Sequence, residues 1–270
     1  MKDYKALLRS VLDDHTLADS RAGKVMKSSH RMFSWDMSQG FPAITGRRLA
    51  FKTMAGELAC FVQGITDVRE FNARSCPIWN ANLADHNERA GTPDNHDLGP
   101  IYGFQWRDFF GIDQLQSVVT KLREDPYDRR MVVSAWNPVQ QPDMVLPPCH
   151  IMWQLTSTDG KTVDLAFYMR SVDLALGLPF DMASYGLLLT LICHETGMVP
   201  GKLTAFLGDC HIYEANHRGV LEYLTRDTHV APQIQLTTPP GTSCTTFEPQ
   251  HATLINYNHG PIIDMGGMAV

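Results

Sequence analysis

Three strand-like segments follow one another in the middle of this 270-residue chain, with no helix pattern between them. They are rich in β-branched and aromatic residues and cover 129–137, 150–158 and 162–171. The Asp159-Gly160 step between the last two is a hairpin signal. A long apolar helix pattern, 180–197, comes directly afterwards. This order predicts an α+β fold with one large β-sheet packed with helices, and it argues against a regular βαβ alternation.

The rest of the chain adds helices around that sheet. Residues 1–15 place apolar side chains on one helical face, and 49–66 is apolar nearly all round, which predicts a buried helix. Glu57 lies inside this buried helix, which is costly unless the carboxylate is used or paired. Further expected elements are a strand at 28–37, a helix at 113–126 that stops at Pro126, a helix near 214–226 and a short strand near 252–257. From 80 to 97 the composition turns polar, which predicts a long inserted loop.

Composition limits the class of protein. With 44% hydrophobic residues, the chain can bury one sizeable core, so we expect a single domain over residues 1–270. The formal charge of −6 argues against direct binding of nucleic acid. None of the six cysteines forms a Cys-x-x-Cys pair, so a metal site has little support and free thiols in a reducing compartment are expected. No stretch has the length of a membrane span or the apolar core of a signal peptide, so we expect a cytoplasmic protein.

The stretch LPPCHIMWQ (146–154) holds the first candidate for chemistry. Cys149 follows a Pro-Pro turn and opens a strand, where it is an exposed nucleophile if nearby positive charge lowers its pKa. A buried, inert thiol is the alternative. His150 beside it is a base, a ligand or a packing residue, and packing is favoured.

Arginines supply the second candidate site. Arg129 and Arg130 come just before a strand, and Arg170 with Ser171 ends another. Arg21 lies in an N-terminal loop. Arginines with a hydroxyl suit bidentate capture of a phosphate, and a solvated surface patch is the alternative.

A histidine and a tyrosine lie two residues apart near a later strand end. His211 and Tyr213 therefore face the same side, where they suit reading of hydroxyl groups. A packed tyrosine with a surface histidine is the alternative.

These residues, in this order, match a known pattern. The chain resembles thymidylate synthase and its relatives, the pyrimidine nucleotide C5-transferases, almost from end to end. The stretches that carry the resemblance are GELACFVQGITD, IWN, DLGPIYGFQWR, DRRMVVSAWNP, LPPCH, RSVDLALGLPFDMASYGLL, GDCHIY and MAV. The resemblance implies a thymidylate synthase-like α+β fold, in which a face of the large mixed sheet forms the interface of a homodimer.

The resemblance also implies roles. In this family a cysteine at the PPCH position adds to carbon 6 of the pyrimidine ring, and carbon 5 then attacks methylenetetrahydrofolate. This implies that Cys149 is the nucleophile, that Glu57 organises proton transfers and that Tyr102 helps remove the carbon 5 proton. The implied binding residues are Arg21, Arg170 and Ser171 for the nucleotide phosphate, Arg129 and Arg130 from the other subunit, His211 and Tyr213 for the sugar, and Asp173, Trp79 and the Val270 tail for the folate.

One departure concerns the substrate. Thymidylate synthases normally have Asn where this chain has Asp181, and that amide donates to O4 of uracil and accepts from its N3 hydrogen. An ionised carboxylate can only accept, so facing O4 it would cost about 1–3 kcal/mol. Cytosine presents an amino donor there instead. Asp at this position, with Met169 before Arg170, is the pattern of the deoxycytidylate hydroxymethylases of bacteriophages. The alternative is that Asp181 serves as a helix N-cap.

The resemblance therefore implies conversion of dCMP to 5-hydroxymethyl-dCMP, for modified phage DNA in a host cytoplasm. A further departure is that the second Trp of the family's IWDEW stretch is absent from IWNANLAD (78–85), which weakly supports access of water. Methylation of dCMP, methylation of dUMP and hydroxymethylation of CMP stay open. A catalytically silent nucleotide-binding protein is disfavoured by the retained residues. A cysteine hydrolase is disfavoured because adjacent strand residues point to opposite faces.

Overall fold

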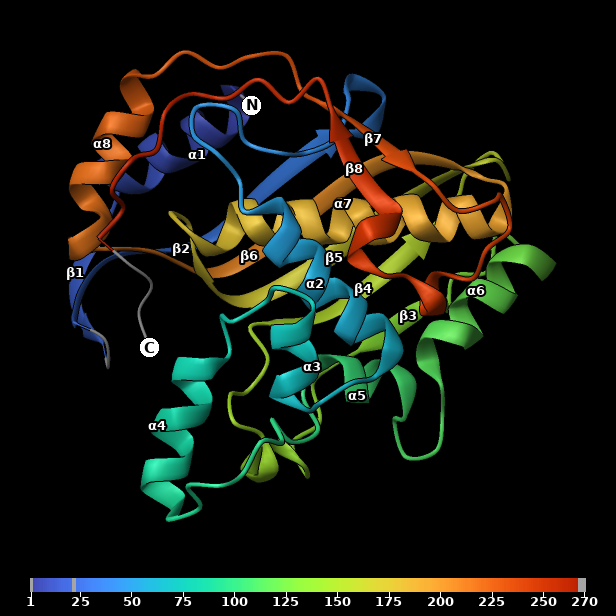
Figure 1. Ribbon diagram of the computed structural model, residues 1–270. Coiled ribbons are helices and arrows are strands. Elements are labelled where there is room, and N and C mark those ends of the chain that lie inside the picture. Colours follow the sequence, from blue (N-terminus) through green and yellow to red (C-terminus); the bar gives the residue numbers. More distant parts are fainter. Residues whose placement is uncertain (1, 21–22, 267–270) are drawn as a thin grey trace.

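A six-stranded sheet in the order β1-β2-β6-β5-β4-β3 forms the centre of the protein (Figure 1). The computed structural model describes residues 2–20 and 23–266. The strands are β1 (Thr16–Ser20), β2 (Gly23–Asp36), β3 (Val132–Ser134), β4 (His150–Thr156), β5 (Thr162–Asp173) and β6 (Val199–Tyr213). The β5–β6 pair is parallel and the other neighbours are antiparallel, so the sheet is mixed as expected.

Helices cover one side of this sheet in two layers. The helix between the two parallel strands, α7 (Gly177–Thr196), packs on β5 and β6, and α2 (Phe51–Gln63) packs on α7 (Figure 1). The remaining helices are α1 (Lys2–Asp13), α3 (Val68–Ala73), α4 (Asn80–Ala90), α5 (Tyr102–Arg107), α6 (Gln114–Glu124) and α8 (His217–Thr225). A second, two-stranded sheet pairs β7 (Gln233–Leu236) with β8 (Ala252–Ile255). One continuous hydrophobic cluster joins these layers, and a single domain over 1–270 stays a prediction in keeping with it.

The opposite side of the sheet carries apolar side chains that reach solvent. Met32, Phe206, Tyr168 and Met152 are register partners across β2, β6, β5 and β4, so they form one row. Met32 is 62% exposed, Phe206 45% and Met152 37%. Large side chains on the alternate positions, such as Phe33 and Leu207, point into the core.

The prediction of a long loop over 80–97 is wrong in its first half. Asn80–Ala90 forms α4, and Gly91 ends it in the left-handed conformation with φ 68°. The helix has few apolar residues because its inner face uses Leu83 and the buried amide of Asn87. The Asn87 side chain donates to the Asn95 carbonyl at 2.8 Å and so fixes the turn that follows. Because this contact is polar, the sequence of α4 lacks the helical repeat of hydrophobic residues by which a helix is predicted.

Other predictions differ in extent rather than in kind. The predicted strand at 129–137 is confined to β3, because the chain before it turns at Asp128, whose carboxylate accepts from the Arg130 N–H. The predicted helix at 180–197 begins earlier, at Gly177, with Pro179 in its first turn, where a missing N–H costs nothing. The expected elements at 1–15, 28–37, 49–66, 113–126, 150–158, 162–171, 214–226 and 252–257 are confirmed within a few residues, apart from the longer extent of β2.

Candidate active site

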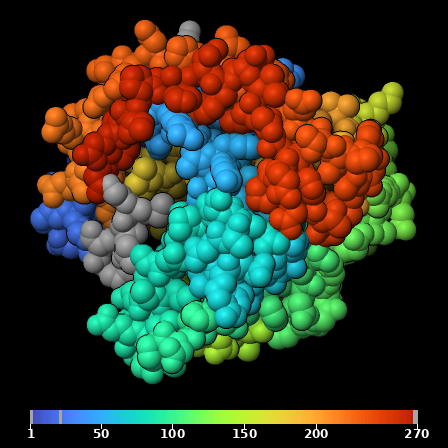
Figure 2. Space-filling model, viewed as in Figure 1, coloured from blue at the N-terminus to red at the C-terminus, as the bar shows by residue number. Residues whose placement is uncertain are grey.

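A pocket of about 160 Å³ lies where α2, α4, α5 and α7 meet the start of β4. Figure 2 shows olive atoms of the α7 start recessed between blue atoms of α2 and cyan atoms of the α4 segment. Its apolar lining residues are Ile78, Trp79, Leu146, Leu176 and Phe180, and its polar or reactive lining residues are Glu57, Asn82, Tyr102, Cys149, His150 and Asp181. The structure therefore brings together five residues predicted from the sequence: Cys149, Glu57, Tyr102, Asp181 and Trp79.

Cys149 is held from both sides at the entrance to β4. Its N–H donates to the Tyr102 hydroxyl at 2.7 Å, and its carbonyl accepts from the Arg170 N–H at 2.8 Å. The β4–β5 register shifts between His150 and Met152, and such irregularities often re-aim a side chain beside a site. Burial raises the pKa of the Cys149 thiol, and the positive charge of Arg170 opposes that rise. Cation, thiol and pocket thus occur together, as a cysteine nucleophile requires.

Arg170 also shapes the turn before the cysteine. Its guanidinium donates to the Pro148 carbonyl at 2.7 Å and to the Pro147 carbonyl at 3.1 Å. The same group lies 5.7 Å from the centre of the Trp136 ring. The cation is thereby fixed near the thiol before any ligand arrives.

Glu57 points from α2 into the pocket. Its Oε1 accepts from the Trp79 indole N–H at 2.9 Å. Burial raises the pKa of Glu57 to about 7, and the indole bond partly opposes this. A carboxyl group with that pKa exchanges protons readily at neutral pH.

Asp181 is not a helix cap. It lies inside α7, four residues after Gly177, and the N-cap position belongs to Leu176. Its side chain is 16% exposed, and the nearest basic atom, His150 Nε2, is 3.9 Å from Oδ1, beyond hydrogen-bond distance. Burial raises the pKa of Asp181 well above its usual value, and the charges of Glu57 and Asp173 raise it further. The carboxyl group is therefore available to a ligand in the pocket.

His150 takes the packing role that the sequence favoured. Its Nδ1 lies 2.8 Å from the Tyr185 hydroxyl, and its ring stacks on Tyr102 with centroids 4.0 Å apart. Burial lowers the pKa of His150 to about 3, so the ring is neutral near pH 7. It forms an uncharged wall beside Asp181.

Asp173 shapes the approach to α7. Its Oδ1 accepts from the N–H groups of Ala175 at 2.8 Å and Leu176 at 3.3 Å. A Cβ added at Gly177 would lie 3.5 Å from the Asp173 Cβ and 3.7 Å from the Asp181 Oδ2. This backbone position therefore lies between the two acidic residues.

The residues predicted to bind phosphate and sugar lie outside this pocket. Ser171 and Asp173 on β5 are register partners of Asp209 and His211 on the parallel strand β6. The rings of His211 and Tyr213 are 5.1 Å apart, and His211 Nδ1 lies 3.5 Å from Asp209 Oδ1. These groups therefore share one end of the two strands, the end that leads into α7.

The arginine pair behaves differently. Arg129 and Arg130 are exposed before β3, and Arg130 is paired with Asp128 at 3.1 Å. Neither lines the Cys149 pocket. Arg21 and Val270 lie outside the described residues.

Sequence reasoning missed part of the pocket. Asn82, Ile78, Leu146, Leu176 and Phe180 line it but were not singled out. The signal for Asn82 is its position, three residues after Trp79, where the family's IWDEW stretch has its second Trp. The apolar wall formed by the other four suits a flat ring, as the predicted pterin requires.

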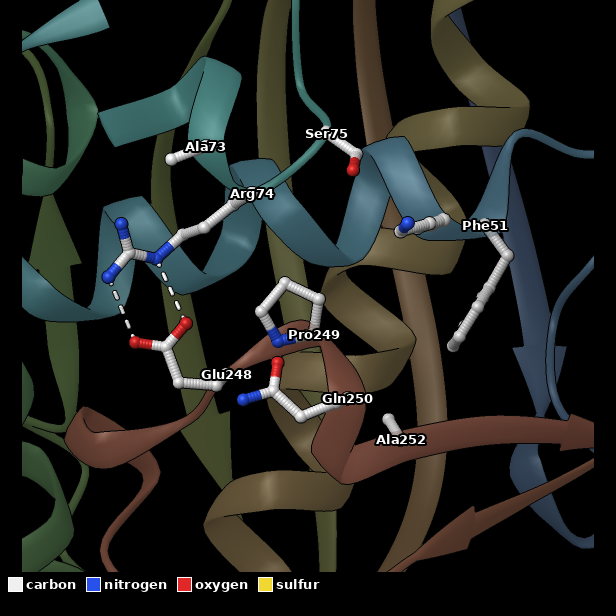
Figure 3. Close-up of a pocket in the computed structure, with 9 residues that line it drawn as sticks. Phe51, Ala73, Arg74, Ser75, Glu248, Pro249, Gln250 and Ala252 are labelled. Atoms are coloured by element: carbon white, nitrogen blue, oxygen red, sulfur yellow. Dashed lines mark hydrogen bonds and ion pairs between the residues drawn. The ribbon is translucent and has the colours of Figure 1, made fainter. Parts of the chain in front are cut away.

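A second pocket of about 470 Å³ has a different chemistry (Figure 3). Arg74 spans it and donates to both oxygens of Glu248, at 3.0 and 2.9 Å. Figure 3 shows this pair pointing toward each other from the end of α3 and the segment before β8. The pocket shares no lining residue with the Cys149 pocket and holds no cysteine, so we assign the reaction to the latter.

Comparison with known proteins agrees with this geometry. The family model described as Thymidylate synthase matches residues 2–270. The thymidylate synthase of Herpesvirus ateles is 35% identical over 279 residues, which cover 97% of this chain and 96% of that protein. The chain belongs to the thymidylate synthase family. Two further relatives are the thymidylate synthase of Enterobacteria phage T4, 36% identical over 235 residues (84% of this chain, 82% of that protein), and thymidylate synthase 1/2 of Encephalitozoon cuniculi, 37% identical over 241 residues (83% and 82%).

Membership of the thymidylate synthase family fixes the reaction class. Its members are one-carbon transferases that act on pyrimidine nucleotides with methylenetetrahydrofolate as co-substrate, so this chain is such an enzyme. Within residues 2–20 and 23–266, no group of three or more His, Cys, Asp or Glu side chains is arranged to hold a metal ion. None of the helices described is long and apolar enough to cross a membrane.

Proposed function

We propose that this enzyme converts dCMP to 5-hydroxymethyl-dCMP, with methylenetetrahydrofolate as the carbon donor. The observation that carries the proposal is Asp181. It is a carboxyl group that neither caps its helix nor forms a hydrogen bond within the described structure, and it lines the same pocket as the Cys149 thiol.

A carboxyl group suits cytosine in both of its protonation states. Burial raises the pKa of Asp181 and so favours its protonated form, and in this proposal the carboxyl group enters the reaction with that proton. Its O–H then donates to N3 of cytosine, and its carbonyl oxygen accepts from the amino group at carbon 4. When Cys149 adds to carbon 6, N3 becomes more basic and takes this proton, and the ionised carboxylate accepts from both nitrogens. Uracil tolerates only the protonated carboxyl, since an ionised one has no hydrogen to give to O4.

The other pocket residues supply the remaining steps. The Cys149 thiolate attacks carbon 6 beside the Arg170 cation. The Tyr102 hydroxyl, which accepts from the Cys149 N–H, is assigned to help remove the carbon 5 proton, and Glu57 receives or returns protons near neutral pH. Trp79 belongs to the apolar wall against which the folate ring packs, and Asp173 stands beside that wall.

The nucleotide's phosphate and sugar are assigned to the end of β5 and β6. Arg170 and Ser171 bind the phosphate together with Arg21, and His211 and Tyr213 bind the sugar hydroxyl. The closeness of these residues on neighbouring parallel strands supports the assignment. Closure over the folate by the tail that ends in Val270 stays a prediction.

We infer that the enzyme is a homodimer joined through the exposed sheet face. The row Met32, Phe206, Tyr168 and Met152 is a continuous apolar strip across four strands. Interfaces of permanent homodimers are large and apolar, and a bare strip of this kind is typical of them. In a single subunit, Arg129 and Arg130 are exposed and lie outside the pocket. Both facts support their reaching the partner's phosphate site.

The test is to identify the product by mass spectrometry after incubation with methylenetetrahydrofolate and dCMP, dUMP or CMP. We expect dCMP to gain a hydroxymethyl group, and Cys149→Ser to form no product. A dCMP product that gains only a methyl group would support cytosine as the substrate and contradict the capture of water. A hydroxymethylated CMP with dCMP unused would reject the deoxyribose preference.

Methylation of dUMP is the second candidate, because the relatives at 35–37% identity are named thymidylate synthases. Conversion of dUMP to dTMP, with dCMP unused, would establish it. Asp181 would then act toward uracil as a permanently protonated substitute for an amide.

A further inference from the structure

Asn82 occupies the pocket wall opposite Asp181's helix, on α4. Trp79 is the N-cap residue of this helix, and its indole is anchored to Glu57 at 2.9 Å. Asn82 follows three residues later, so it lies on the same helix face, and it lines the pocket with Trp79 and Glu57. The anchor therefore holds the beginning of α4 against the pocket.

The Asn82 amide is free to bind a ligand. The Tyr102 hydroxyl accepts from Cys149, the Trp79 indole donates to Glu57, and His150 is bonded to Tyr185. No residue in the described part of the chain forms a hydrogen bond with the half-buried Asn82 side chain. An amide with a donor and an acceptor unused beside an apolar pocket is costly unless a ligand or water pairs with it.

We propose that Asn82 is the positioning residue that holds the water molecule which captures the carbon unit on carbon 5. This inference rests on the hydroxymethyl product proposed above. The rest of this wall is built from Ile78 and the Trp79 ring, and the far side from Leu176 and Phe180, which give water no partner. An ordered water needs two or more polar partners, and the Asn82 amide and the Glu57 carboxyl supply them.

The step balances without an oxidant or a reductant. After tetrahydrofolate leaves, the nucleotide carries a methylene group doubly bonded to carbon 5 and the Cys149 sulfur on carbon 6. The water oxygen, held by Asn82, forms a bond to the methylene carbon. The pair of the old double bond moves between carbons 5 and 6 and expels the Cys149 thiolate, while the water's proton passes to the ionised form of Glu57. Since the pKa of Glu57 is about 7, that form is available at neutral pH.

The test separates this step from the earlier ones. Enzyme in excess is mixed with methylenetetrahydrofolate and dCMP that carries tritium at carbon 5. Tritium release then reports every step up to loss of the carbon 5 hydrogen, and the nucleotide product reports water capture. Asn82→Leu removes the amide and keeps the same branched arrangement of side-chain heavy atoms. Asn80→Leu makes the same exchange on the same helix at an exposed position outside the pocket and serves as the matched control.

We expect Asn82→Leu to release tritium within about twofold of the wild-type rate and to form 5-hydroxymethyl-dCMP at least about tenfold more slowly, the effect of one lost hydrogen bond to the reacting water. Asn82→Ser, which keeps a hydrogen-bonding group, recovers most of that rate, and Asn80→Leu matches the wild type in both. Equal slowing of tritium release and product formation, or no slowing at all, would overturn the role of Asn82. A wild-type enzyme that makes only methylated nucleotide would overturn the proposed function itself, and that result is visible before any variant is made.

Discussion

Replacement of Asp181 by Asn is the sharpest test of the substrate assignment. Asp181→Asn changes a carboxyl to an amide of the same shape, in a site where burial already disfavours the ionised form. Asp181 forms no hydrogen bond with another described residue and caps no helix, so the exchange breaks no hydrogen bond within residues 2–20 and 23–266. We therefore expect the melting temperature to stay within a few degrees of the wild type.

The expected loss lies in proton transfer. The amide can turn and still pair with N3 and the amino group of cytosine, so the KM for dCMP should change by less than about tenfold. It has no acidic proton to give to N3 when Cys149 adds to the ring. General acid catalysis contributes about 10²–10⁴-fold, or about 3–5 kcal/mol in the barrier, and kcat with dCMP should fall by that factor. With dUMP the amide donates to O4 and accepts from the N3 hydrogen at any pH, so turnover of dUMP should appear or rise.

The assay is tritium release from carbon 5 of dCMP and of dUMP, measured for both proteins across a range of substrate concentrations. Glu195→Gln makes the same acid-to-amide exchange at a buried position outside the pocket, where the carboxylate accepts from the Cys244 N–H, and it controls for effects of the exchange on folding. Retention of dCMP turnover within about threefold of the wild type, with no gain for dUMP, would show that Asp181 does not donate to the ring.

Three further changes test other parts of the structure. Folding raises the pKa of Glu57 from 4.5 to about 7, so the folded state binds this proton more tightly than the unfolded state does. The protein therefore loses stability as pH rises from 4.5 to about 7. Glu57→Gln should remove this loss, and Tm measured against pH should fall less steeply for the variant than for the wild type. Phe206→Glu places a charge in the middle of the apolar row on the sheet, and sedimentation should show monomers. These monomers should retain their secondary structure but lose activity, because the partner's arginines are then absent. Arg74→Met leaves Glu248 and Glu70 without their cation, and we expect the free energy of unfolding to fall by about 1–3 kcal/mol in chemical unfolding. The kinetics of the folded enzyme should stay unchanged. An unchanged denaturation midpoint would mean that the bidentate pair adds nothing to stability.

Sequence patterns predicted the sheet well where β-branched, aromatic and other apolar residues occur on both faces of a strand, including the face that is exposed in the single subunit. β4, β5 and α7 were placed within a few residues for this reason. The start of α7 shows the limit. The sequence pattern begins this helix at Phe180, yet Pro179 fits the first helical turn, and the helix begins at Gly177. Residues 177–179 decide whether Asp181 can be a cap, and only the structure excludes that role.

The helix α4 shows a different limit. Its inner face combines Leu83 with the amide of Asn87, so neither composition nor period reveals it. Once the helix exists, Asn82 lies on the face of Trp79, and a residue that looked like part of a loop becomes part of the pocket. Cys149 and Asp181, both picked out by the family pattern, line one pocket, but no pattern in the sequence reports which amides are left without partners.

The two carboxyl groups of the pocket divide the proton chemistry between them. Both Glu57 and Asp181 have pKa values raised by burial, but the Trp79 indole stabilises the ionised form of Glu57, and no such bond helps Asp181. In the proposed mechanism Asp181 gives a proton to the ring, and Glu57, with a pKa of about 7, exchanges one near neutral pH. Charge on Asp181 would also raise the pKa of the Cys149 thiol, so a neutral Asp181 favours the thiolate. As pH rises through the pKa of Asp181, the ring loses its acid and the thiolate gains a repelling neighbour. Turnover of dCMP should consequently fall on the alkaline side, and Asp181→Asn should remove this pH dependence from whatever activity it retains; an alkaline limb unchanged in the variant would assign the titration to another group.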